Sequence, residues 1–128
     1  MVRIPRSIVV IAAAVLVAPL SAQMPEVAAQ QTIQVANFSF TPAAIHLAAG
    51  KPVTLTFVNQ SNSGHDFTAK EFFAASRISA GGAPDGRLEL KPHETQSITL
   101  TPGAGAYKAH CSHFMHESMG MHADVTVS

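Results

Sequence analysis

Apolar and polar residues alternate along most of the chain after residue 31. The clearest run is Val53–Val58, in which three apolar residues would face one side and two threonines the other. This period of two is typical of a strand with one buried face. Similar patterns predict strands over residues 32–40, 45–47, 65–69, 87–90, 96–100, 106–111 and 124–127. About eight short strands predict an all-β protein, an antiparallel Greek-key β-sandwich.

The connections between these strands are marked by turn-forming residues and one helical segment. Residues 59–64 form a polar turn cluster, and residues 79–86 are rich in Gly, Ala and Pro, which indicates a surface loop. Residues 70–75 predict one or two helical turns, anchored by two phenylalanines. The core candidates outside this helix are Phe38, Phe40, Phe57 and Phe67.

The N-terminus has the features of a secretory signal peptide over residues 1–22. Arg3 and Arg6 precede an apolar run from residue 8 to 20, and small residues follow it. The apolar run is shorter than the roughly 20 residues of a membrane-spanning helix, although a retained anchor is the alternative. We therefore expect an exported, periplasmic protein with no stable membrane span after cleavage. Residues 23–31 would be a flexible mature N-terminus, followed by one domain over residues 32–128.

Charge and composition narrow the choice of partner. Removal of Arg3 and Arg6 leaves six basic against eight acidic residues, a net charge of about −2. Without a basic field, nucleic acid is not expected as a partner. A single cysteine excludes a disulfide within the chain, so an exported protein needs another reason for its thiol. Seven histidines are many for 128 residues, and five of them lie between His93 and His122.

The segment C-S-H-F-M-H-E-S-M-G-M, from Cys111 to Met121, carries the most informative pattern. Cys111 ends one predicted strand, and His116 and Met121 lie in the loop before the next. His65 follows the 59–64 turn, and loops from different strands cluster at one end of a sandwich. One thiolate, two imidazoles and a thioether are the donor set of a blue-copper site.

These segments resemble the cupredoxins, the small blue-copper proteins of the plastocyanin and azurin type. The resemblance rests on Y-K-A-H-C-S-H-F-M-H-E-S-M-G-M-H-A-D-V-T-V together with the upstream V-T-L-T-F-V-N and G-H-D-F-T, and covers residues 32–128. It implies one copper ion that cycles between Cu(I) and Cu(II). By the same resemblance its ligands would be His65, Cys111, His116 and Met121.

The loop offers more donors than one ion requires. His113 is the alternative to His116, and Met119 is the alternative to Met121. The additional donors in or beside the loop are His110, Met115 and His122. His110 should point away from the face that carries Cys111. Asp66, next to His65, would either orient the site through hydrogen bonds or be a solvated turn carboxylate. His46 and His93 have no expected role.

Three functions fit these residues. The first is a one-electron carrier that exchanges electrons with a redox partner protein, as a monomer. The second is a periplasmic copper-handling or copper-resistance protein, which would receive copper from a donor protein or pass it to an acceptor. The third is an enzyme with a cysteine nucleophile, which we rank lowest because no base and orienting residue accompany Cys111. The protein is therefore not expected to be an enzyme.

Overall fold

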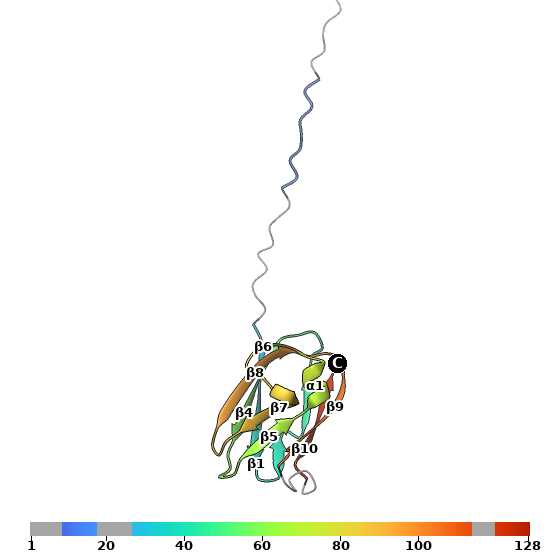
Figure 1. Cartoon of the computed structure of the whole chain (residues 1–128). Coiled ribbons are helices and arrows are strands. Elements are labelled where there is room, and N and C mark those ends of the chain that lie inside the picture. The colour runs from blue at the N-terminus through green and yellow to red at the C-terminus, as the bar shows by residue number, and fades with distance from the viewer. Residues whose placement is uncertain (1–8, 18–26, 114–119) are drawn as a thin grey trace, which may run out of the picture.

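The computed structural model describes residues 9–17, 27–113 and 120–128. Its strands form two five-stranded sheets that pack face to face (Figure 1). The first sheet has the order β2-β1-β4-β8-β6. Its strands are β1 (Ala29–Ala36), β2 (Ser39–Thr41), β4 (Val53–Asn59), β6 (Arg77–Ala80) and β8 (Thr95–Thr101).

The second sheet has the order β3-β10-β9-β5-β7 and carries the predicted site. Its strands are β3 (Ala44–Leu47), β5 (His65–Thr68), β7 (Arg87–Leu90), β9 (Gly105–His110) and β10 (His122–Val127). The short helix α1 (Lys70–Ala74) follows β5 directly, as predicted, and buries Phe72 and Phe73. A 3-10 turn, η1 (Pro84–Gly86), precedes β7.

The sandwich class is confirmed, with differences in detail. β1 pairs with β4, and β3 with β10, in parallel, whereas the other pairings are antiparallel. β1 also begins at Ala29, three residues before the alternation predicts, because Ala29–Gln31 continue the ladder alongside Val53–Leu55. Ten strands are assigned among the described residues, compared with about eight expected.

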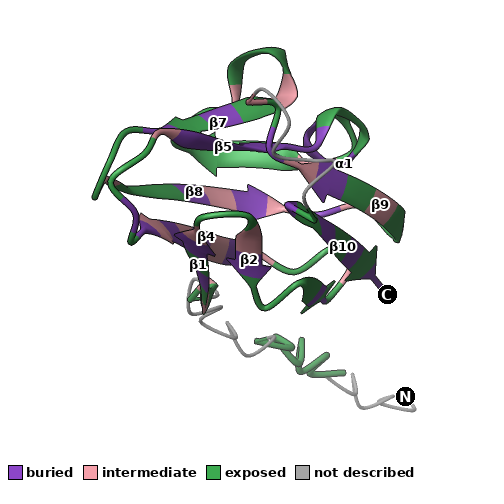
Figure 2. Ribbon diagram, turned by 90° about the horizontal axis from the view of Figure 1, so that it is seen from below, coloured by how far each residue is buried: buried purple, intermediate pink, exposed green. Residues whose placement is uncertain are grey.

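The core lies between the two sheets, where the buried positions of the strands face one another (Figure 2). Phe67 is at its centre, with Phe57 at 4.7 Å, Phe40 at 5.4 Å and Phe73 at 6.1 Å between ring centroids. These buried rings confirm Phe40, Phe57 and Phe67 as core residues. Burial of such aromatic side chains contributes a large part of the stability of a sandwich of this size.

Two predictions about local structure were wrong. Phe38 is not in the core: it is 39% exposed and has a positive φ of 62°, because Asn37 and Phe38 form the turn between β1 and β2. Residues 79–86 are not wholly a loop, since the edge strand β6 includes Ser79 and Ala80. All four residues of β6 are exposed, so no apolar alternation marks this strand in the sequence.

The apolar segment near the N-terminus lies away from the sandwich (Figure 1). Its large side chains within residues 9–17 are at least 78% exposed. Among the helices of the described residues, none has the length and apolar character needed to cross a bilayer.

Candidate metal centre

Cys111 lies immediately after β9, at the point where the strand leaves the ladder. Its side chain is fully buried, and its backbone N–H donates to the carbonyl of Met121 at 3.1 Å. Burial raises the pKa of the Cys111 thiol above its usual value, an effect opposed by the backbone N–H groups of Asp66 and His113. A buried thiol of this kind binds a metal ion by releasing its proton.

His65 is the first residue of β5 and is also fully buried. Its Nδ1 lies 3.9 Å from Sγ of Cys111, although the two residues are 46 positions apart. Its Nε2 lies 3.2 Å from Oδ1 of Asn37, in the turn between β1 and β2. An amide oxygen only accepts hydrogen bonds, so Nε2 carries the proton and the lone pair of Nδ1 faces the thiol. Asn37 therefore holds the imidazole in the tautomer that a metal requires.

The turn before His65 is organised by Asn59, a buried residue at the end of β4. Its side-chain amide donates to the carbonyls of Ser63 at 2.8 Å and Lys91 at 3.0 Å. Its Oδ1 accepts from both the backbone N–H and the hydroxyl of Ser61, at 3.0 and 2.8 Å. One side chain thus satisfies several polar groups of the 59–64 turn and ties the turn before β5 to Lys91.

Asp66 joins the His65 strand to the Cys111 segment. It is fully buried, so the solvated-turn interpretation was wrong. Its backbone N–H donates to Sγ of Cys111 at 3.4 Å, and its Oδ1 accepts from the N–H of Ser112 at 2.9 Å. The hydroxyls of Ser112 and Thr68 donate to the same carboxylate, at 2.5 and 2.7 Å. The carboxylate instead accepts hydrogen bonds from Thr68 and from Ser112, the residue after Cys111, as the other interpretation requires.

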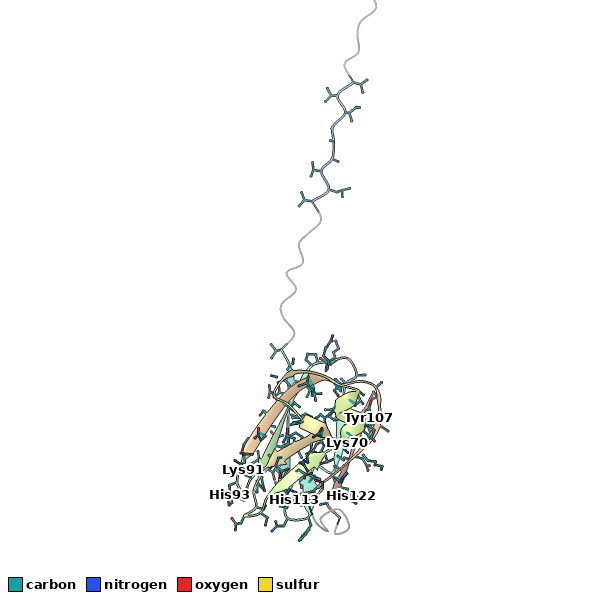
Figure 3. All side chains as sticks on the ribbon, in the orientation of Figure 1. Lys70, Lys91, His93, Tyr107, His113 and His122 are labelled. Atoms are coloured by element: carbon teal, nitrogen blue, oxygen red, sulfur yellow. The ribbon has the colours of Figure 1, made fainter. Side chains whose placement is uncertain are left out.

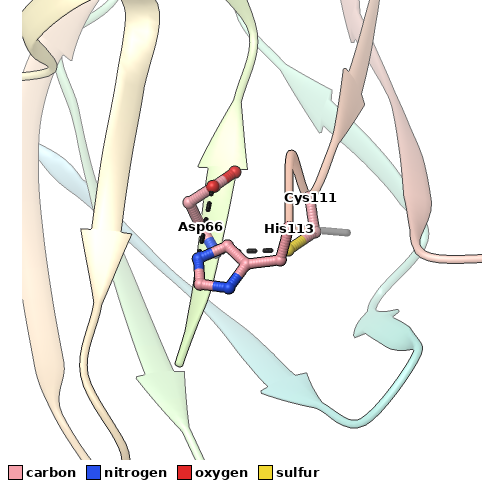
Figure 4. Close-up of side chains that lie close together, drawn as sticks. All are labelled: Asp66, Cys111 and His113. Carbon is pink, nitrogen blue, oxygen red and sulfur yellow. Dashed lines mark hydrogen bonds and ion pairs between the residues drawn. The ribbon is translucent and has the colours of Figure 1, made fainter. Parts of the chain in front are cut away.

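His113, the predicted alternative to His116, lies close to Cys111 and Asp66. Metal-ligating atoms of Asp66, Cys111 and His113 lie within 4.8 Å of one another (Figure 4). Nε2 of His113 donates to Oε1 of Glu89 at 2.9 Å and lies 3.6 Å from Oδ2 of Asp66. Two carboxylates therefore compete with a metal for this nitrogen.

The remaining His and Met residues differ in burial and position. Met121 is fully buried beside Cys111, where the backbone hydrogen bond between them places it. His110 is half-buried and lines a surface cavity with Arg87 and Lys108, on the face opposite the core, as predicted. His122 is exposed, toward the same end of the molecule as His113 (Figure 3). The predicted ligand His116, and Met115 and Met119, lie outside the described residues. His46 and His93 are exposed.

The arrangement of His65 and Cys111 fits a shared metal ion. An imidazole nitrogen at roughly 2.0 Å and a thiolate at roughly 2.3 Å from one first-row metal ion, at a trigonal angle, would be about 3.7 Å apart. The observed separation of Nδ1 and Sγ is 3.9 Å. A thiolate is a soft donor that binds Cu(I) and zinc well, and imidazole suits both metals.

The chain belongs to the cupredoxin-like domain family, whose model matches residues 7–127. Among solved structures it is similar to auracyanin B, with a TM-score of 0.58 and 22% identity over 82% of this chain and 93% of that one. It is also similar to dithionite-reduced auracyanin from the photosynthetic bacterium Roseiflexus castenholzii, with a TM-score of 0.57 and 22% identity over 78% of this chain and 98% of that one. No curated protein matches the chain.

Proposed function

We propose that this protein is an exported blue-copper protein that carries one electron between partner proteins. The observation that supports it most is the buried pair of His65 and Cys111, with a lone-pair nitrogen 3.9 Å from the sulfur. His116 and Met121 would complete the site from the loop between β9 and β10. Bound copper would supply a Cu(I)/Cu(II) couple.

The residues around the proposed copper site have separate roles. Asn37 fixes the His65 tautomer, and the backbone N–H of Asp66 donates to the sulfur. Burial of Cys111 keeps water from the thiolate, and a buried, constrained site limits rearrangement when the charge changes. Met121 would act as the weak axial donor, which tunes the potential more than it holds the ion.

Export is supported by the N-terminal segment. The apolar side chains within residues 9–17 pack against nothing in the described part of the domain, as expected of a signal peptide that is removed. We propose a periplasmic location on this basis.

The test of the site is the visible spectrum of the copper-loaded protein. Thiolate-to-Cu(II) charge transfer should give intense absorption in wild type, and Cys111→Ala should abolish it. Ser79→Ala is the control, since it changes an exposed residue of the edge strand β6 and leaves both the thiol and its surroundings in place. Wild type without this band, or a Cys111→Ala variant that keeps it, would show that the blue-copper proposal is wrong.

Copper handling is the second candidate, and the position of His113 favours it. An additional imidazole within 4.8 Å of the Cys111 ligand atom gives a second ion a donor near the first. Titration with Cu(I) under reducing conditions distinguishes the two functions. A second equivalent, lost when His113, Met115 and His122 are replaced together, supports handling. Strict one-to-one binding supports electron transfer.

A further inference from the structure

Asp66 places a carboxylate inside the protein, where charges are weakly screened. The residue is 0% exposed. Its two oxygens accept from the hydroxyl of Thr68 and from the N–H and hydroxyl of Ser112, at 2.5 to 2.9 Å. Three donors converging on one carboxyl group are the surroundings that suit its ionised form, which is an acceptor only.

The carboxylate lies beside the thiol that we propose as the copper ligand. One of its oxygens is within 4.8 Å of Sγ of Cys111, and both side chains are fully buried. At such a separation, and without intervening solvent, a unit charge acts strongly on its neighbour. The carboxylate is not itself well placed as a ligand, since hydrogen bonds to Thr68 and Ser112 already occupy both oxygens.

We propose that Asp66 is a positioning residue that also lowers the reduction potential of the copper held by Cys111 and His65. This inference rests on the proposed function. In the couple, one electron reduces Cu(II) to Cu(I), and no bond or proton needs to change. The electron decreases the positive charge at the site, so a fixed negative charge nearby stabilises the oxidised form relative to the reduced form.

Glu89 provides a comparison within the same sheet. It pairs with Asp66 across β5 and β7, but its side chain is 52% exposed and its Oε1 accepts from His113. Solvent screens such a charge far more than it screens a buried one. The Glu89 carboxylate accepts from His113 at the surface, whereas the Asp66 carboxylate lies beside the sulfur itself.

The test compares midpoint potentials of copper-loaded variants. The thiolate-to-copper absorption is followed while an electrode sets the potential. Asp66→Asn removes the charge with little change of shape, and we expect its potential to rise above that of wild type. Glu89→Gln removes one charge from the neighbouring surface position, and we expect a smaller shift. An unchanged or lower potential in Asp66→Asn, or an equal rise in Glu89→Gln, would overturn the inference.

Thr68→Val separates charge from geometry. This variant keeps the carboxylate and loses one hydrogen bond to it, so its potential should stay the same or fall. A rise matching that of Asp66→Asn would show that disturbed geometry, not charge, sets the potential. If circular dichroism shows that Asp66→Asn does not fold, the neutral variant Asp66→Ser takes its place.

The spectrum of wild type shows whether a negative result counts against the proposed function or only against the inference about Asp66. If wild type shows no charge-transfer band, the blue-copper proposal and this inference both fall. If wild type shows the band and Asp66→Asn leaves its midpoint potential unchanged, only the inference about Asp66 falls.

Discussion

At the scale of single residues, Asn37 shows how a hydrogen bond prepares a histidine to bind a metal. It accepts from Nε2 of His65 and so leaves Nδ1 to face the thiol of Cys111. Partners of this kind fix both the tautomer and the orientation of a ligand ring. The proposed site therefore depends on a residue that is not one of its predicted ligands.

Replacement of Asn37 by Ala should weaken copper binding by roughly tenfold or more, because the His65 ring loses its partner. Competition with a chelator of known affinity measures the change. Asn62→Ala is the control, since Asn62 forms the same type of contact with the exposed His93, at 2.6 Å. Equal copper affinities for wild type and Asn37→Ala would exclude this role for Asn37.

The sequence alone could propose the donors, which remain a prediction, but not the residues that would orient them. Cys111 and Met121 stand out because their spacing within one loop is visible in the chain. Asn37 is 28 positions from His65, and no local pattern links the two. Asp66 was recognised because it is adjacent to His65, yet it is hydrogen-bonded to Ser112, which is 46 positions away and follows β9.

At the scale of elements, the 59–64 turn determines where β5 starts and therefore where His65 lies. Asn59 bonds to Ser61 and Ser63 within the turn and to Lys91 after β7. The turn is thus tied to the neighbouring strand of the site sheet by the same side chain.

Asn59→Ala should lower the free energy of unfolding of the metal-free protein by about 2–3 kcal/mol, since it leaves buried backbone groups without partners. Urea denaturation measures this. Gln60→Ala, at the adjacent exposed position, should change it by less than about 0.5 kcal/mol. Similar losses in both variants would argue against a special role for Asn59.

Strand prediction succeeded where one face of a strand is buried. In β4 and β10 every second residue is buried, and the alternation is visible in the sequence. It failed for β6, an edge strand with four exposed residues, and for Phe38, where the chain turns after β1. The parallel partners of β1 and β10 were also missed, because alternation gives the buried face of a strand and not the direction of its neighbour.

At the scale of the whole molecule, metal binding should stabilise the fold. A ligand that binds only the folded state adds about 2.7 kcal/mol when its free concentration is 100 times its dissociation constant. We expect copper to raise the melting temperature of wild type, measured by calorimetry. Cys111→Ala should lose most of that rise. An equal rise in both proteins would indicate that copper binds elsewhere.

Metal binding should also affect how firmly β5 is held against β9. Among the described residues, these strands are paired at one position, Thr68 with His110. Beyond it, hydrogen bonds that involve side chains link Asp66 of β5 to Cys111 and Ser112, the two residues after β9. Two strands joined by so few backbone hydrogen bonds separate more easily than fully paired strands. An ion bound by both His65 and Cys111 would hold β5 to the segment that follows β9. Amide hydrogen exchange along β5 should therefore be slower when the site is filled than when it is empty.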